Sequence, residues 1–215
     1  IIADRGNELP VSAFEPVVDG TWPTGTTKYE KRCIATEIPV WDPNTCIQCG
    51  KCSLVCPHGV IRMKVADEAE LKNAPQGFKS APYKGKEFAG KQFIWQMSPE
   101  DCTGCGICVS ACPAKNKADP TRKAINMDHI ENHLEEQKAC WKFFETLPYV
   151  KRTDVAKNLP KTTQMIQPLF EFSGACAGCG ETPYVKLLTQ LFGDRMVVAN
   201  ATGCSSIYSG NLPTT

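Results

Sequence analysis

The sequence predicts an α+β fold, in which a small cysteine-rich domain is followed by the first elements of an α/β domain. The first part is predicted by the cysteines, since 13 of the 215 residues are Cys and they gather in tight runs. Such runs are typical of metal ligation rather than of a disulfide framework. The second part is predicted by a helical pattern, a short apolar run and a small-residue loop that follow one another near the end of the sequence.

Composition narrows the classes of function. Lys and Arg total 24 against 23 Asp and Glu, a net charge of +1, so no nucleic-acid surface is indicated. Hydrophobic residues make up 42%, enough for a core in one or two domains, and no apolar run is long enough to span a membrane. The sequence begins at Ile1 without Met or a leader pattern and stops at Thr215 in loop-like residues, which is typical of a piece of a longer chain.

Four segments follow from the local patterns. Residues 1–40 are rich in Pro and Gly and predict an extended arm or inter-domain segment. Residues 41–127 hold two cysteine runs, and the apolar pairs Val60-Ile61 and Ala124-Ile125 after them predict short strands. Between the runs, residues 64–98 carry Pro, Gly and many Lys, and they predict an irregular insertion with a solvated charged loop.

The two remaining segments each contain a helical pattern. In residues 128–170, a helix packed on the cysteine-rich domain is predicted by apolar side chains at helical spacing: Ile130, Leu134, Trp141 and Phe144. A linker containing Pro148, Pro160 and Pro168 follows this helix.

Residues 171–215 predict the start of the second domain. Thr182-Pro183 predicts a helix N-terminus, and Gly193 predicts its end. The helix carries an apolar stripe of Tyr184, Leu187, Leu188 and Leu191. Met196–Ala199 then predicts a short buried strand.

The pattern C-x2-C-x2-C-x3-C-P occurs twice, 56 residues apart. This is the spacing of bacterial ferredoxins with two 4Fe-4S clusters, in which the fourth Cys of each run ligates the other cluster. We therefore assign one cluster to Cys46, Cys49, Cys52 and Cys112, and the other to Cys102, Cys105, Cys108 and Cys56. This part of the chain resembles two-cluster ferredoxin domains.

Zinc, the histidines and the tryptophans each offer an alternative interpretation. Zinc prefers separated C-x2-C pairs or mixtures of Cys and His, so a zinc module is the weaker interpretation. His58 follows the first run and is expected to be a surface or hydrogen-bonded turn residue, while His129 and His133 are expected on solvated faces. The tryptophans Trp41, Trp95 and Trp141 are expected in the core or at domain contacts.

A third cysteine group, Cys176, Cys179 and Cys204, lies outside these runs. It supplies three thiolates, whereas a 4Fe-4S cluster held by Cys alone needs four. Cys33 or Cys140 could complete it, but each stands alone in the sequence, and we expect both to be buried apolar residues.

At these positions the resemblance becomes narrower. Residues 176–184 and 199–208 look like the thiamine diphosphate domain of pyruvate:ferredoxin oxidoreductases, and residues 23–28 and 38–41 look like the approach to the ferredoxin domain of that family. The resemblance implies that the third cysteine group holds the cluster nearest the thiamine, with its fourth ligand beyond Thr215.

The same resemblance implies neighbours of thiamine diphosphate and its Mg²⁺: Glu181, Gly203, Cys204, Ser205 and Ser206. For Glu181, a carboxylate at a helix N-terminus is an equal alternative. The family's G-D-G…N motif is absent, since Gly193-Asp194-Arg195 differs in its third residue. No catalytic residue is assigned, and these residues alone are expected to be inactive.

The resemblance implies the electron-relay portion of a cytoplasmic enzyme, or of one in a reducing organelle of an anaerobic eukaryote. Such an enzyme converts pyruvate and coenzyme A to acetyl-CoA and CO2, works as a homodimer and reduces ferredoxin or flavodoxin. The lysines of residues 64–91 could steer an acidic ferredoxin. The alternative is a stand-alone two-cluster electron-transfer subunit without catalytic activity.

Overall fold

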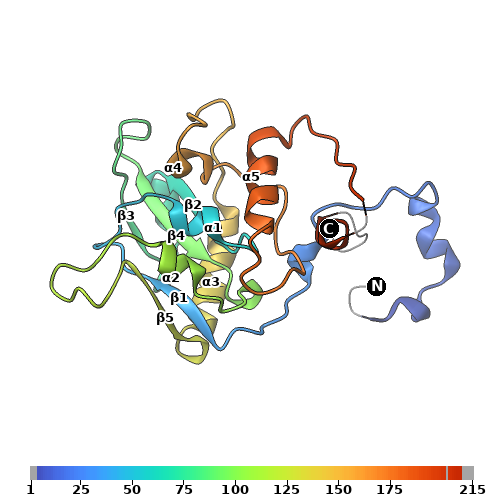
Figure 1. The fold of residues 1–215 in the computed structure, drawn as a ribbon, viewed down its shortest axis with the longest axis horizontal. Coiled ribbons are helices and arrows are strands. Elements are labelled where there is room, and N and C mark those ends of the chain that lie inside the picture. Colours follow the sequence, from blue (N-terminus) through green and yellow to red (C-terminus); the bar gives the residue numbers. More distant parts are fainter. Residues whose placement is uncertain (1–3, 202, 210–215) are drawn as a thin grey trace.

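A computed structural model describes residues 4–201 and 203–209 of the chain (Figure 1). Parts of the predicted segments 1–40 and 171–215 therefore lie outside the described residues. Among the residues described, none of the helices has the length and apolar character needed to cross a membrane.

Among the residues described, five short strands form two antiparallel sheets. β1 (Glu37–Trp41) pairs with β5 (Ile125–His129). The second sheet has the order β2-β4-β3, with β2 at Ile61–Ala66, β4 at Gln92–Met97 and β3 at Ser80–Pro82. Each strand that precedes one cysteine run thus pairs with the strand that follows the other run. This crossed pairing carries the last Cys of each run toward the other half of the domain.

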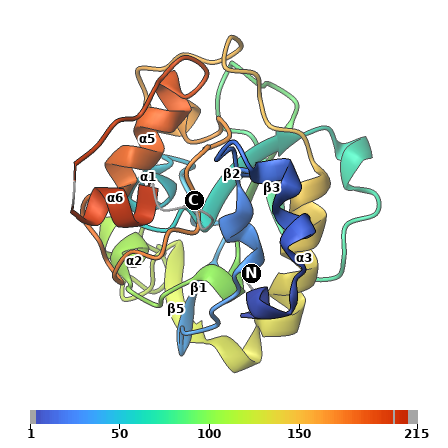
Figure 2. The ribbon, with the colours of Figure 1, turned by 90° about the vertical axis from the view of Figure 1, so that its right-hand side faces the viewer.

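Short helices follow the cysteine loops; of the two longer helices described, Leu134–Thr146 packs on β4, while Thr182–Phe192 lies against two of the short helices (Figures 1 and 2). The α-helices are α1 (Lys51–Val55), α2 (Ile107–Ala111), α3 (Leu134–Thr146), α4 (Pro160–Thr163), α5 (Thr182–Phe192) and α6 (Cys204–Ser209). The 3-10 helices are η1 (Gly6–Glu8), η2 (Val11–Val17), η3 (Thr26–Tyr29), η4 (Glu68–Leu71), η5 (Pro99–Asp101) and η6 (Ile130–Asn132). α1 and α2 contact each other, while α3 packs on β4.

The core lies between the sheets, the cysteine loops and α3. All six residues of β2 are buried, which shows that both faces of this strand are covered. The Trp41 and Trp95 rings stack with their centroids 6.0 Å apart, and Trp141 stacks on Phe144 within α3. The expectation that these tryptophans lie in the core is confirmed.

Strands begin where the sequence predicts them after each cysteine run, at Ile61 and at Ile125. Two other predictions were wrong in part. β1 lies at the end of the predicted arm, and β3 and β4 lie in the predicted irregular insertion. The Pro and Gly residues there mark the turns of a three-stranded sheet, and the run Gln92–Met97 has the apolar and aromatic character of a strand.

The predicted linker is also more ordered than expected. α4 forms within it, and Thr162, Met165 and Ile166 are each at most 1% exposed. Prolines at 148, 160 and 168 therefore indicate irregular backbone and a helix start, not an exposed tether.

The last segment combines a confirmed helix with two corrections. α5 begins at Thr182 and ends at Phe192, as the sequence predicts. Its apolar stripe is not buried, however: Tyr184 is 73% exposed and Leu188 45%, Leu187 and Leu191 are half-buried, and polar residues of the same helix are buried instead. Met196–Ala199 forms no strand, and Val197 is 95% exposed. A strand needs a hydrogen-bonded neighbour, and the described part of the chain offers none at this position.

Candidate metal centres

The two cysteine loops have the same backbone geometry. Gly50 and Gly106 take left-handed conformations, with φ of 76° and 71°, as the residues that begin α1 and α2. Two positions earlier in each loop, Gln48 and Gly104 also have positive φ, 58° and 69°. These turns bend each loop around a common point, so that successive thiols of one run face the same side.

The first loop closes over a small cavity. Four thiols line it: Cys46, Cys49, Cys52 and Cys112. The rest of the lining is mainly apolar and comes from the facing strands, with Met63, Phe93, Trp95 and Ile125. The structure thus brings together the four cysteines that the spacing groups into one set.

The second loop closes over a cavity of similar size. It is lined by the other set of thiols: Cys56, Cys102, Cys105 and Cys108. Pro39, Ile61, Met127 and His58 complete the wall. In each cavity one thiol comes from the other run, because the crossed strand pairing places it there.

Nitrogen donors point at the sulfurs. The backbone N–H of Gln48 lies 3.3 Å from Cys46 Sγ, and the backbone N–H of Gly104 lies 3.4 Å from Cys102 Sγ. In the first cavity, the indole Nε1–H of Trp95 donates to Cys52 Sγ at 3.3 Å. Such donors stabilise negative charge on cluster sulfurs.

Burial makes these thiols weak acids. Burial raises the pKa of Cys52 to about 12, although the hydrogen bond from the Trp95 indole lowers it. Burial also raises the pKa of Cys102 to about 12. Thiolates are metal ligands and thiols are not, so these positions lose their protons only when a metal supplies compensating charge. Metal uptake by this domain must therefore release protons.

The donor sets fit polynuclear clusters. Within residues 4–201 and 203–209, no three Cys, His, Asp or Glu side chains converge as a single metal ion would require. The thiols instead surround cavities, four to each. The second cavity also has a polar atom without a partner among the described residues, Nε2 of His58, although this side chain is only 4% exposed.

His58 is a hydrogen-bonded turn residue, one of the two alternatives expected, and it is buried rather than at the surface. Its Nδ1 lies 2.9 Å from the carbonyl oxygen of Ser173, which only accepts, so Nδ1 carries the proton. Burial lowers the pKa of this imidazole. His58 thus joins the wall of the second cavity to the segment that leads into the third cysteine group.

The third cysteine group is open to solvent on this chain. Cys176 and Cys204 are exposed and Cys179 is half-buried. Burial would raise the pKa of Cys179, but the backbone N–H groups of Thr182 and Glu181 at the start of α5 outweigh it and lower the pKa. A Cβ built on Gly178 would lie 3.8 Å from Cβ of Cys105, so this loop packs against the second cavity.

The residues expected beside thiamine diphosphate lie near this loop. Glu181 is exposed and is the N-cap residue of α5, without a side-chain capping bond. Gly203 is exposed, and Cys204, Ser205 and Ser206 form the first turn of α6, where the Ser206 hydroxyl donates to the carbonyl of Ala201.

Two other expectations for cysteines and histidines had mixed outcomes. Cys140 is fully buried in α3, as expected, but Cys33 is exposed, with φ of 51°, in the extended segment before β1. That segment crosses the surface, so a short apolar side chain there has no core to enter. His129 is exposed, and His133 is half-buried with its Nε2 2.9 Å from Asp128.

The lysines of residues 64–91 do not form one solvated group. Lys64 is 1% exposed, because α3 covers this face of β2, and its Nζ lies 2.8 Å from the carbonyl oxygen of Phe144. Lys84 and Lys86 are exposed, and Lys84 Nζ donates to the carbonyl oxygen of Cys46, which lines the first cavity, at 2.7 Å.

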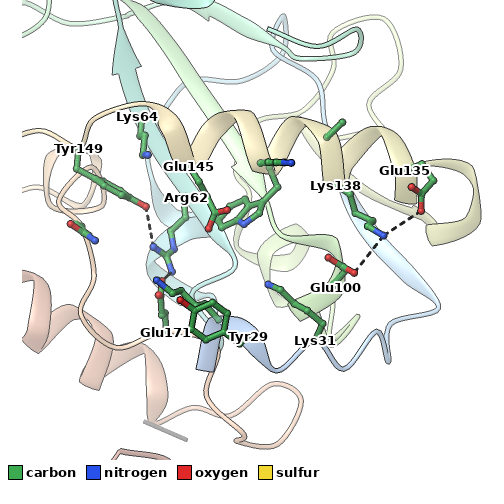
Figure 3. A pocket seen from close by; sticks show the side chains of 15 residues that line it. Tyr29, Lys31, Arg62, Lys64, Glu100, Glu135, Lys138, Glu145, Tyr149 and Glu171 are labelled. Carbon is green, nitrogen blue, oxygen red and sulfur yellow. Dashed lines mark hydrogen bonds and ion pairs between the residues drawn. The ribbon is translucent and has the colours of Figure 1, made fainter. Parts of the chain in front are cut away.

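A hollow away from the cysteines lies between η3, α3 and the segments around Tyr149 and Glu171 (Figure 3). Arg62 reaches it from β2 and is bonded to the Tyr149 hydroxyl and the Glu171 carboxylate. Lys138 bridges Glu100 and Glu135 at its rim. Its charges are therefore largely paired with one another.

Several functional neighbours were missed in the sequence: Trp95, Gln48 and the buried position of His58. The repeat itself contained a signal for Trp95. It stands 56 residues after Pro39, and both residues line a cavity, so the repeat extends back into the strands.

Comparison with known proteins agrees with these cavities. Residues 45–116 match the model of a 4Fe-4S dicluster domain, and residues 1–35 match EKR, a domain of unknown function. The two-cluster prediction is thereby confirmed, and the zinc interpretation is set aside.

Relatives extend over the whole chain. It is 59% identical over 215 residues to the pyruvate-flavodoxin oxidoreductase of Nostoc sp. and 60% identical to that of Trichormus variabilis, covering 100% of the chain and 18% of each relative. It is 55% identical over 213 residues to the pyruvate:ferredoxin oxidoreductase of Moorella thermoacetica, covering 99% of the chain and 17% of that protein. The chain spans about 18% of the length of the curated relatives it matches. Along its whole length the chain is thus similar to one segment of pyruvate:ferredoxin and pyruvate-flavodoxin oxidoreductases, and it contains a 4Fe-4S dicluster domain.

Proposed function

We propose that this chain is the electron-relay segment of a pyruvate:ferredoxin or pyruvate-flavodoxin oxidoreductase. The observation that carries the proposal is the pair of four-thiol cavities with a third cysteine loop packed against one of them. A 4Fe-4S cluster takes up and releases one electron at a time. The chain's own residues would hold three such clusters in a row, exclude water from two of them and donate hydrogen bonds to their sulfurs.

Ligand roles follow the cavities. One cluster would be held by Cys46, Cys49, Cys52 and Cys112, and the second by Cys102, Cys105, Cys108 and Cys56. Cys176, Cys179 and Cys204 would provide three ligands to the third cluster, with a fourth from outside these residues.

The order of the relay is argued from contacts. The Gly178 loop lies against Cys105, and the chain leading into it is bonded to His58, so electrons would pass from the third cysteine group to the second cavity. The outlet would be the first cavity, beside exposed Ile47 and the basic residues Lys84 and Lys86. An acidic flavodoxin or ferredoxin fits such a basic rim.

The chemistry upstream would belong to the whole enzyme. Pyruvate oxidation with coenzyme A would take place on thiamine diphosphate and Mg²⁺, with Glu181 and the Gly203–Ser206 turn near that cofactor. We propose a homodimer in a reducing compartment such as the cytoplasm, because the ligand thiols must stay reduced. The chain would comprise an arm (1–40), a cluster domain (41–127), a helix with a packed linker (128–170) and the start of the thiamine domain (171–215).

The second candidate, a stand-alone electron carrier, is favoured by the two completed cavities alone. This candidate gives no role to the Cys176–Cys179 loop. A substitution in the loop therefore tests whether the chain is a relay segment or a carrier. Cys179→Ser in the intact protein that contains these residues should prevent pyruvate and coenzyme A from reducing the ferredoxin-type clusters. Dithionite should still reduce them, as followed by electron paramagnetic resonance under anaerobic conditions. If pyruvate and coenzyme A fail to reduce the clusters of the unsubstituted protein while dithionite reduces them, the carrier is favoured.

A further inference from the structure

One lysine is buried between the two sets of cysteines. Lys186 of α5 is 2% exposed, although it lies on a helix whose apolar stripe is not buried. Its chain packs on the cluster domain, where a Cβ built on Gly59 would lie 3.4 Å from Lys186 Cδ. Its ammonium donates to the carbonyl oxygen of Ser53, in α1 between Cys52 and Cys56.

The charges around Lys186 leave its ammonium without a carboxylate partner. In the described part of the chain, no Asp or Glu forms an ion pair with it. The neighbouring groups that attract it are the thiols of Cys56 and Cys52, whereas Arg62 repels it. Arg62 has its own counter-charge, the Glu171 carboxylate (Figure 3).

A buried cation without a counter-charge is costly, because water no longer solvates it. The only negative charge that could offset Lys186 here is that of ligated thiolates and their clusters. Cys52 and Cys56 belong to different cavities, so one ammonium faces both candidate clusters. A cation in a medium of low polarity acts strongly on charges nearby.

A buried polar network fixes this position. Ser53 Oγ lies 2.9 Å from the carbonyl oxygen of Ile61 and 3.1 Å from Oε1 of Gln164. Gln164 donates to Gln190 of α5 at 3.0 Å, and Gln190 donates to the carbonyl of Ile166 at 2.8 Å. These bonds explain why α5 presents its polar face to the cluster domain.

We propose that Lys186 is a positioning residue whose fixed positive charge raises the reduction potentials of both ferredoxin-type clusters. When one electron from the reductant enters a cluster, the negative charge beside Lys186 increases, and the ammonium stabilises the reduced form more than the oxidised form. This inference rests on the proposed function, in which these clusters carry electrons.

The test is an anaerobic redox titration of the intact protein, followed by electron paramagnetic resonance. Lys186→Met removes the charge with little change in volume, and Lys186→Gln removes it but keeps a donor for the Ser53 carbonyl. Both should lower the equilibrium constant for reduction at least tenfold, which corresponds to a potential more negative by about 59 mV. Lys186→Arg keeps the charge and should restore most of the potential.

Lys64→Met is the matched control, since Lys64 is as deeply buried but is held by the Phe144 and Leu147 carbonyls on the side of α3. It should leave both potentials unchanged. If Lys186→Met assembles its clusters incompletely, Lys186→Gln supplies the comparison.

Wild-type potentials in both neutral variants would overturn the inference, as would a Lys186→Arg shift as large as that of Lys186→Met. Iron and sulfide analysis of the same samples separates this outcome from failure of the proposed function. In that case the wild-type protein itself would lack the clusters.

Discussion

The two cysteine loops share one backbone but meet different surroundings. In both, a glycine in the left-handed region begins a short helix, and a backbone N–H two residues after the first Cys points at its sulfur. The first loop then carries Gln48, whose side chain donates to Pro82 and accepts from the Lys84 N–H. The second has Gly104 at the same place, where a Cβ would lie 3.2 Å from the Glu37 carbonyl oxygen.

The strands repeat this contrast. Trp95 donates to a sulfur in the first cavity, while Pro39, its counterpart in the repeat, lines the second cavity without a side-chain donor. The first cavity lies beside exposed lysines, and the second lies beside the Cys176–Cys179 loop. Backbone geometry is therefore repeated where it shapes the two cavities, and side chains differ where, in the proposed relay, the first site would face the electron acceptor and the second the third cysteine group.

The largest expected effect is a difference in stability between substitutions at the two glycines that begin α1 and α2, Gly50 and Gly106. Gly50→Ala should destabilise the protein by about 2–4 kcal/mol, because the new Cβ would lie 2.9 Å from the Pro160 carbonyl oxygen at a φ of 76°. Gly106→Ala meets no atom within 4 Å and should cost only about 1–2 kcal/mol for its backbone conformation. Guanidinium unfolding of both variants checks this order, and equal losses would mean that packing of α4 on the first loop adds nothing.

Trp95→Phe sharpens the contrast between the cavities. It removes the indole donor to Cys52 and keeps an aromatic ring, so the first cluster should become harder to reduce and the second should not change. The measurement is the pair of potentials from an anaerobic titration. Equal shifts in both clusters would contradict a local hydrogen-bond effect.

The basic rim beside the first cavity should control encounter with the electron acceptor. Lys84→Glu should slow reduction of an acidic flavodoxin by about two- to tenfold at low salt, with the difference shrinking as salt rises. Lys142→Glu, an exposed residue of α3, is the control and should have little effect. Stopped-flow rates at several salt concentrations measure both, and equal slowing would argue against an outlet at the first cavity.

A further effect concerns pH and the strand that α3 covers. Burial lowers the pKa of Lys64 to about 7, with repulsion from Arg62 contributing, from a usual value of 10.5. Between these values the unfolded chain binds more protons than the folded one, so this residue makes stability rise with pH, by at most about 1.4 kcal/mol per pH unit. Lys64→Met should remove that rise, which guanidinium unfolding of both proteins from about pH 7 to about pH 9 would reveal. A parallel pH dependence in the two proteins would show that Lys64 stays protonated when folded.

Spacing was sufficient to predict the cysteine sets, because a short loop with fixed intervals leaves its thiols few directions in which to point. Periodicity likewise predicted α3 and α5. Periodicity did not predict which face of α5 is buried. An apolar stripe can pack on this segment or on residues outside it, and the pattern is the same in both cases. Lys186 was therefore overlooked, and only the buried network with Ser53 and Gln164 reveals its place.

Strands were harder to predict than loops. β4 was missed because its flanking Pro, Gly and Lys residues suggested irregular structure, yet its pairing with β2 is what crosses the fourth cysteines. Lys64 was expected in solvent for the same reason. Both faces of β2 are covered because α3, far along the chain, packs on one of them, and the residues of β2 alone do not predict this contact.

Iron counting in paired variants tests the crossed ligand sets most directly. Cys56→Ser combined with Cys102→Ser removes two ligands of one proposed cluster, so the intact protein should lose about four iron atoms. Cys56→Ser combined with Cys52→Ser removes one ligand from each cluster, although both residues lie in the same run, and should lose about eight. The opposite result, with the greater loss from the first pair, would contradict the crossed arrangement on which the relay depends.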